Sequence, residues 1–230
     1  MALGRMPECD AQRRSSEQRA FNLADALTAA PLPTPAPVSP DVQAVLDFWF
    51  GTAGSPESGT LRPMWFTKSD ATDREIGFRF GALIEQAMRG ELAGWPAQPL
   101  GALARIIVLD QFTRNVFRGT PRAFAGDARA LAAASDMVAS GFDAALPPAQ
   151  RAFVYLPFEH AEDLALQDAA VQHFSRLAEA APELQGMLDY AHKHRAVIAR
   201  FGRFPHRNAI LGRRSSAQEL AFLQEPGSSF

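Results

Sequence analysis

Glycine and proline residues divide the chain from Ser39 onward into segments of helical length, which limits the folds open to it. Within most segments, apolar side chains recur at spacings of three and four residues, the period of an amphipathic α-helix. The alternation of apolar and polar residues that marks a β-strand is almost missing. The sequence therefore predicts an all-α fold, an array of about eight antiparallel helices joined by short turns.

Capping and breaking residues set the expected limits of the helices. Ser216 precedes Glu219 by three residues, the spacing of a capping box, so a last helix is expected to start there. Pro157 is expected to interrupt or restart the helix around it, because proline lacks the amide hydrogen that a helix interior uses. In chain order, the expected helices cover residues 40–50, 69–90, 100–117, 127–141, 147–155, 158–180, 182–202 and 216–223.

The N-terminal residues differ in composition from the rest of the chain. A polar start is followed by Glu17–Ala30, which can form a short helix. The prolines that come next impose an extended backbone, and they are Pro31, Pro33, Pro35, Pro37 and Pro40. We therefore predict a disordered, proline-rich extension over residues 1–39 and a single helical domain over residues 40–230.

Composition excludes several classes of protein. A net charge of -2 over 230 residues with 47% hydrophobic content is typical of one soluble domain and less basic than proteins that coat nucleic acid. The single cysteine, Cys9, rules out a disulfide within the chain and is typical of a reducing compartment. No apolar run is long enough to span a membrane, and no secretory signal is present. We expect a cytoplasmic protein without a membrane partner.

The motifs of common cofactor sites are missing. The sequence contains no GxxxxGK[ST] loop, no GxGxxG after a strand, no GxSxG elbow and no CxxC pair. Candidate metal ligands follow one another at Glu159, His160, Glu162 and Asp163, with His192 and His194 further along. Their spacing does not suit a metal, because ligands on one helix face stand three or four residues apart. We expect neither a metal nor a cofactor.

The segment Tyr190–Arg214 concentrates positive charge. It holds six arginines, one lysine and three of the five histidines, and it holds no acidic residue. Such a segment can form an anion-binding site, a nucleic-acid surface or a buried charge network. We do not expect the nucleic-acid surface, because helical periodicity divides the cations between faces and turns Phe201 inward. The other two interpretations stay open.

Three titratable residues fall on helix faces that should be apolar. Helical spacing places Asp110, Glu162 and His194 on stripes of otherwise apolar side chains. An unpaired buried charge is costly, so these groups are expected to satisfy one another in a shared cluster. Within it, Glu162 and His194 are the candidates for moving a proton. The expected cationic partners are Arg114, Arg203, His206 and Arg207.

This polar cluster has two competing interpretations. The structural interpretation is an internal ion network that fixes how the helices pack. The functional interpretation is a cleft in which arginine and histidine side chains hold an anionic small molecule. Arginine forks match the geometry of carboxylate and phosphate groups, so we favour one of these as the ligand.

Four separated blocks of sequence occur in one order: LDFWFG (46–51), LDQFTRNVFRGTPRAFAGD (109–127), YLPFEHAED (155–163) and RFGRFPHRNAILGR (200–213). Together they resemble the bacterial "domain of unknown function 924" family over about residues 40–230. The resemblance implies an all-helical, tetratricopeptide-like α/α superhelix and implies no activity. Thr113 departs from the family's pattern, in which we expect proline.

The resemblance also extends the polar cluster. The residues that match polar positions of the family's pattern are Asp110, Gln111, Arg114, Asn115, Arg118, Asp127, Glu159, His160, Glu162, His194, Arg203, His206, Arg207, Asn208 and Arg213. On this basis Arg118, Glu159, His160 and Asn208 join Asp110 and the cationic partners as candidate binding residues.

A second hypothesis is an adaptor that binds a protein or peptide. It rests on the tetratricopeptide-like resemblance and on Trp49, Trp65 and Trp95, which are potential anchors for a partner. The simpler interpretation of these tryptophans is that they belong to the core. An exposed apolar groove would favour the adaptor, and a closed polar pocket would favour the small anionic ligand.

Overall fold

The structure, a computed structural model, describes residues 38–228, and in that part of the chain it contains helices and no strand. The helices are α2 (Pro40–Phe50), α3 (Asp70–Arg89), α4 (Pro99–Ile106), α5 (Thr113–Val116), α6 (Asp127–Ala139), α7 (Pro148–Glu159), α8 (Leu164–Ala180), α9 (Gln185–Phe201) and α10 (Ala217–Phe222). A π-helical segment, Ile107–Phe112, joins α4 to α5 without a break. The all-α prediction is confirmed.

Two expectations for the N-terminus concern residues that the structure does not describe. The predicted helix Glu17–Ala30 and the predicted extension over residues 1–39 lie outside the described residues, except for Val38 and Ser39. Ser39 is the N-cap of α2, as its sequence predicts, and its side chain accepts a hydrogen bond from the amide of Val42.

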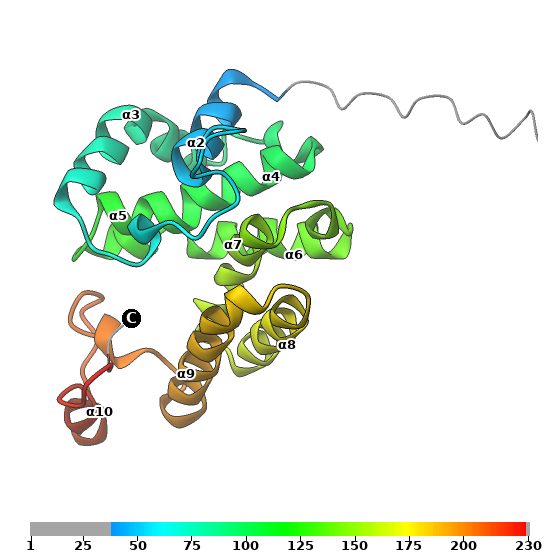
Figure 1. The fold of residues 1–230 in the computed structure, drawn as a ribbon. Helices are drawn as coiled ribbons and strands as arrows, with labels where there is room; N and C mark the ends of the chain where they lie inside the picture. Colours follow the sequence, from blue (N-terminus) through cyan, green and yellow to red (C-terminus); the bar gives the residue numbers. More distant parts are fainter. Residues whose placement is uncertain (1–37, 229–230) are drawn as a thin grey trace, which may run out of the picture. The chain divides into compact units, whose positions relative to one another are not determined.

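From α6 to α9, helices that follow one another in the chain pack against each other. Helix α8 packs along α9, and α7 packs against α8 (Figure 1). Helices α2 to α5 gather at the other end of the domain, where α4 packs against α2, α6 and α7. The tetratricopeptide-like superhelix stays a prediction.

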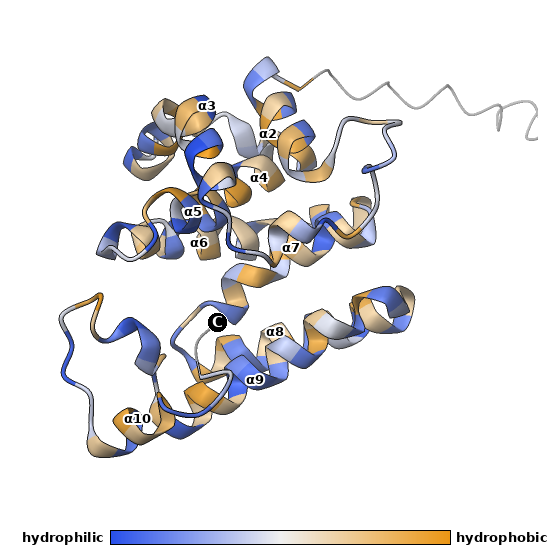
Figure 2. Cartoon of the chain, turned by 60° about the vertical axis from the view of Figure 1, so that its left-hand side comes forward, coloured by the Kyte–Doolittle hydropathy of each residue, from blue (hydrophilic) through white to orange (hydrophobic). Residues whose placement is uncertain are grey.

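An aromatic cluster forms the centre of the main core. Trp49 is 1% exposed, and its ring lies 5.6 Å from Phe112 and 5.7 Å from Phe153. Trp65 packs on the same cluster, and Trp95 also packs against the core. In Figure 2, α8 and α9 each carry both hydrophilic and hydrophobic residues, as expected for helices with one buried face. Within residues 38–228, no helix has the length and apolar character needed to cross a bilayer.

The π-helical segment lies at one of the closest backbone contacts of the described residues. The start of α6 approaches it so closely that a Cβ added to Gly126 would lie 2.1 Å from the carbonyl oxygen of Leu109. Only glycine leaves room for this approach. The approach brings the next residue, Asp127, beside Arg114, which follows the π-helical segment. Segments of this kind are often found at functional sites.

The break between α7 and α8 differs from the sequence prediction. Pro157 does not interrupt a helix but lies inside α7, which continues to Glu159. Its missing amide removes only one hydrogen bond near the end of α7, so the helix tolerates it. Helix α8 begins instead after Asp163, whose side chain caps the amide of Leu166 at 3.0 Å. As a result, Glu162 lies in the connecting turn and not on a helix face.

Candidate functional site

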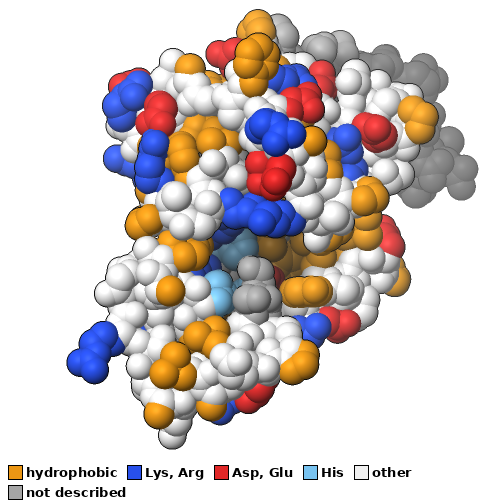
Figure 3. Space-filling model, turned by 90° about the vertical axis from the view of Figure 1, so that its left-hand side faces the viewer, with side chains coloured by type: hydrophobic (Ala, Val, Ile, Leu, Met, Phe, Trp, Pro, Cys, Tyr) orange, Lys and Arg blue, Asp and Glu red, His pale blue; other side chains and the backbone are white. Residues whose placement is uncertain are grey.

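A cavity of about 490 Å³ opens between segments that are far apart in the sequence. Its walls come from residues 64–68, from the end of the π-helical segment and α5, from Phe124, and from the C-terminal part of the chain. We call it the anion cavity. Within the described residues, its titratable lining has no carboxyl group and consists of Lys68, Arg114, Arg118, His160, His194, His206 and Arg207. Figure 3 shows a hollow on one face, with Lys or Arg side chains at its rim and His side chains inside.

Behind the cavity wall, Asp110 forms the centre of a buried polar network. Its carboxylate is 1% exposed and lies 2.8 Å from Nδ1 of His160 and 3.0 Å from Nη1 of Arg114. Gln111 donates a further hydrogen bond of 2.7 Å. Burial alone would raise the pKa of Asp110, but the charge of Arg114 and the hydrogen bonds from His160 and Gln111 hold it well below its usual range. Asp110 therefore stays ionised.

The hydrogen bond to Asp110 fixes the tautomer of His160. A carboxylate can only accept, so Nδ1 of His160 carries the hydrogen and donates it. Burial, and then the charge of Arg114, lower the pKa of His160, so the ring is neutral at neutral pH. In a neutral ring protonated at Nδ1, Nε2 carries a lone pair. His160 is thus a proton acceptor held in one orientation by a buried carboxylate.

Arg114 and Arg207 share the carboxylate of Asp127 unequally. Arg114 donates to both oxygens of Asp127, at 2.8 and 3.0 Å, and also pairs with Asp110. Arg207 reaches Asp127 only at 3.5 Å, which is the outer limit of a hydrogen bond. Arg114 is therefore well compensated, and Arg207 is not.

Arg207 is a buried cation with incomplete compensation. The residue is 6% exposed, and its guanidinium lies over the ring of Phe124 at 4.8 Å and over that of Phe204 at 4.5 Å. Its Nε has no hydrogen-bond partner among the described residues. Burial, and then the nearby charge of Arg114, lower the pKa of Arg207 to about 10. The side chain still remains charged at neutral pH.

His194 and Glu159 form a second buried pair beside the cavity. Nδ1 of His194 lies 2.9 Å from the carbonyl oxygen of Tyr190 and 3.1 Å from Oε1 of Glu159. Burial, and then the charge of Asp110, raise the pKa of Glu159 to about 8. Burial also lowers the pKa of His194 to about 3. Both shifts favour the neutral forms, so we describe this as a contact between neutral groups and not as an ion pair.

The raised pKa of Glu159 predicts how the free energy of unfolding depends on pH. Between the unfolded pKa near 4.5 and the folded pKa near 8, folding must take up a proton at Glu159, so this group destabilises the fold as pH rises. In Glu159→Gln, the glutamine side chain has nearly the same shape as the glutamic acid but has no carboxyl group to titrate. We expect the variant to gain stability over the wild type by on the order of 1 kcal/mol per pH unit between pH 5 and pH 7. Urea denaturation at both pH values measures this gain, and a difference independent of pH would contradict the assignment.

The structure brings most of the candidate residues together. Arg114, Arg118, His160, His194, His206 and Arg207 all line the anion cavity, and Asp110 and Glu159 lie directly behind its wall. Arg118 also pairs with Asp73, at 2.9 and 3.1 Å. Burial, and then the charge of Arg207, lower the pKa of His206 to about 4, so this ring is neutral as well.

Three candidate residues lie outside the cavity lining. Glu162 accepts two hydrogen bonds from Arg213 and one from the amide of Phe204, which ties two loops together. Arg203 pairs with Glu219, at 2.6 and 2.8 Å. Asn208 donates to Ser215 and to Glu219. These contacts join the C-terminal segments to one another, and they place none of the three residues among those that line the cavity.

Sequence reasoning missed Lys68 and the partner of Arg203. Lys68 is an exposed residue in the loop before α3 and carries no pattern that marks it. The partner of Arg203 carried a signal, because Glu219 is the second member of the capping box. Its position was correctly predicted as a cap, but one carboxylate here serves both the cap and the ion pair.

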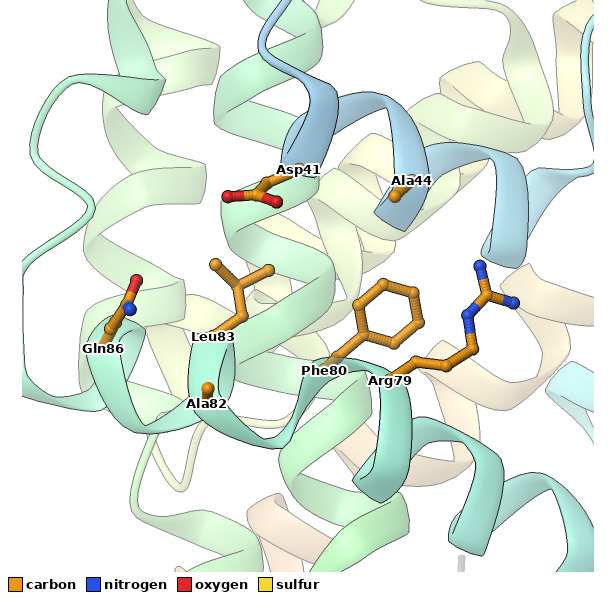
Figure 4. Close-up of a pocket in the computed structure, with 7 residues that line it drawn as sticks. All are labelled: Asp41, Ala44, Arg79, Phe80, Ala82, Leu83 and Gln86. Atoms are coloured by element: carbon orange, nitrogen blue, oxygen red, sulfur yellow. The ribbon is translucent and has the colours of Figure 1, made fainter.

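A second hollow of the surface is less suited to an anion. A depression of about 330 Å³ between α2 and α3 is lined by Asp41, Ala44, Arg79, Phe80, Ala82, Leu83 and Gln86 (Figure 4). Its one cation, Arg79, lies over the rings of Phe48 and Phe80. Among the described residues, no three His, Cys, Asp or Glu side chains are grouped as metal ligands.

Comparison with known proteins gives a family and a similar solved structure. The family described as "Bacterial protein of unknown function (DUF924)" matches residues 45–227. The chain described as "Structure of Protein of Unknown Function ATU0120 from Agrobacterium tumefaciens" is 37% identical, with a TM-score of 0.69, over 80% of this chain and 96% of that chain. A search of curated proteins finds no match. Neither description assigns an activity to the cavity.

Proposed function

The chain belongs to the family of bacterial proteins of unknown function DUF924, and because that description assigns no activity, we propose from the site itself that the protein binds a small anionic ligand. The ligand is of the phosphate or carboxylate class and binds in the anion cavity. Its charge is met by Arg207, Arg118 and Lys68. The cavity volume of about 490 Å³ lies in the range of small-molecule sites.

The observation that carries this proposal is the state of Arg207. A buried guanidinium is tolerated when carboxylates compensate it, and Asp127 is already engaged by Arg114 in a two-fold contact. Arg207 therefore keeps one buried donor, Nε, without a partner among the described residues, and its side chain lines a cavity that carries no acid in its lining. An anionic ligand is the group that would complete its compensation.

The competing structural interpretation explains part of the same network. Asp110, Arg114 and Asp127 satisfy one another without any ligand, so they suit an internal ion network. That interpretation does not account for Arg207 or for Lys68, an exposed cation in the cavity lining. We therefore assign the network of Asp110, Arg114 and Asp127 to positioning, and the other lining cations, which are Lys68, Arg118 and Arg207, to binding.

Proton transfer in this site is proposed for His160 and His194. Both rings line the cavity and both are neutral at neutral pH, so each offers a lone pair to a ligand proton, although burial lowers both pKa values and makes the two rings weak bases. Glu162, the other sequence candidate, is held by Arg213, which lowers its pKa against the effect of burial. A carboxylate tied in this way is poorly placed to exchange protons with a ligand.

The adaptor hypothesis has less support. It needs an exposed apolar groove, and the large exposed apolar side chains of the described residues stand on separate elements. They are Leu61, Phe66, Phe78, Leu100, Leu164, Tyr190, Leu211 and Leu220. Trp49 is buried in the core and cannot anchor a partner.

Arg118→Ala provides the first test of the proposal. Arg118 is 39% exposed and pairs with Asp73, and Arg195 is a matched control because it is 41% exposed, pairs with Asp168 and is not among the residues that line the cavity. We expect Arg118→Ala to weaken binding of phosphate or of a small dicarboxylate about fivefold, or roughly 1 kcal/mol, and Arg195→Ala to leave it unchanged. Isothermal titration calorimetry measures both. Equal effects of the two variants would contradict a site at this cavity.

A further inference from the structure

We propose that the anion cavity selects an anion that also contains an O–H donor, and that His160 accepts the hydrogen bond from this donor. The ligand chemistry is therefore narrower than negative charge alone. Hydrogenphosphate has it, because one of its oxygens stays protonated at neutral pH, and so does a carboxylate with a hydroxyl group on the next carbon. This inference rests on the proposed function and names the ligand class of the same site.

The geometry of His160 carries the inference. Nδ1 donates to the buried Asp110 at 2.8 Å, so Nε2 on the other side of the ring is the acceptor. Asp110 is 1% exposed, whereas the side chain of His160 keeps 15% exposure and lines the cavity. Nε2 has no hydrogen-bond partner among the described residues. A ligand donor can therefore meet this acceptor inside the cavity.

Because the orientation of the His160 ring is fixed, Nε2 can accept a hydrogen bond from a ligand O–H group but cannot donate one to an ionised oxygen. Rotating His160 to offer an N–H would break its hydrogen bond to Asp110 and leave a buried carboxylate with one donor fewer. A fully ionised oxygen placed against Nε2 would meet a lone pair and lose the hydrogen bonds that it had in water. A ligand O–H meets the same atom with a hydrogen bond. Arg207 and Arg118 then hold the charged oxygens.

Two residues near His160, Arg114 and His194, support this inference. Arg114 pairs with Asp110 at 3.0 Å and helps to keep that carboxylate ionised, which preserves the donor state of Nδ1. The ring of His194 lies 6.2 Å from that of His160, and its Nδ1 also faces a main-chain acceptor, the carbonyl of Tyr190. Two adjacent imidazoles thus have Nδ1 directed at an acceptor of the protein.

Two matched pairs of ions test the inference. Phosphate and sulfate are similar in size and shape, and only phosphate keeps a hydrogen at neutral pH. Glycolate and acetate differ by one hydroxyl group. Calorimetric titration of the full chain is expected to show phosphate binding more tightly than sulfate, or glycolate more tightly than acetate, by on the order of tenfold. Which pair shows the preference identifies the source of the O–H donor.

His160→Asn is the variant that isolates the acceptor. An asparagine amide can keep the hydrogen bond to Asp110 but offers nothing at the position of Nε2, and thermal unfolding checks that the variant folds. We expect the ratio of affinities within the preferred pair to fall to about 1 in this variant. Equal affinities within both pairs in the wild type, or a preference that survives in His160→Asn, would overturn the inference while leaving an anion site in place. Binding of none of the four ions would contradict the proposed function and the inference with it.

Discussion

Asp110→Ala is expected to lower the free energy of unfolding by about 3–5 kcal/mol, the loss typical of removing one partner from a buried ion pair. The carboxylate is 1% exposed and receives hydrogen bonds or charge from Arg114, His160 and Gln111. Alanine would leave Arg114 with one carboxylate in place of two. It would also leave Nδ1 of His160 without its acceptor and open a small cavity under the π-helical segment.

Urea denaturation at neutral pH measures this loss, with Asp168→Ala as the control. Asp168 forms an ion pair of the same type with Arg195, but both side chains are more than 40% exposed. Exposed pairs contribute about 0–1 kcal/mol, so the control is expected to unfold close to the wild type. Losses of similar size in the two variants would contradict a special role for the network behind the cavity.

Arg207→Met is expected to leave the free energy of unfolding unchanged or to raise it by about 1–4 kcal/mol, although the residue is 6% exposed. Methionine can pack between the rings of Phe124 and Phe204, where the guanidinium now lies. Asp127 keeps its two-fold contact with Arg114. Replacing a buried charge that is poorly compensated by an apolar side chain removes a desolvation penalty and breaks little.

The same substitution distinguishes a ligand site from a structural network. A residue kept for stability should cost stability when it is removed, whereas a residue kept for binding is often destabilising in the free protein. A loss of several kcal/mol in Arg207→Met, comparable to that of Asp110→Ala, would assign Arg207 to the structural network. We expect Asp110→Ala to lower the free energy of unfolding and Arg207→Met to leave it unchanged or to raise it.

The sequence predicted helices well where a cap marks their start. Ser69 accepts from the amide of Thr72, and Ser216 forms a complete capping box with Glu219, both at expected positions. The break predicted at Pro157 was wrong. Proline disrupts the interior of a helix, but Pro157 lies near the end of α7, where the helix tolerates it. The π-helical segment was not predicted, and the close approach of Gly126 to Leu109 within it is a feature of tertiary packing that no local pattern marks.

Helical periodicity located candidate residues at the cavity where the limits of the helix were predicted correctly. Asp110 and His194 were marked by apolar stripes, and both are buried at the cavity. Glu162 was assigned from a helix that begins six residues later than expected, so its predicted face does not exist. Arg203 was assigned by charge alone, and nothing in its local sequence reveals that Glu219 is its partner. Lys68 reaches the cavity from a loop whose position depends on the whole fold.

The central claim is that the anion cavity binds a small anion through Arg207, and one paired measurement tests it most directly. Inorganic phosphate is titrated by calorimetry into the wild type and into Arg207→Met, after urea denaturation has shown that the variant is folded. We predict binding to the wild type and affinity weaker by about a hundredfold in Arg207→Met, at equal or higher stability. Equal phosphate binding by the two proteins, together with a less stable variant, would contradict the claim and make Arg207 part of a structural ion network.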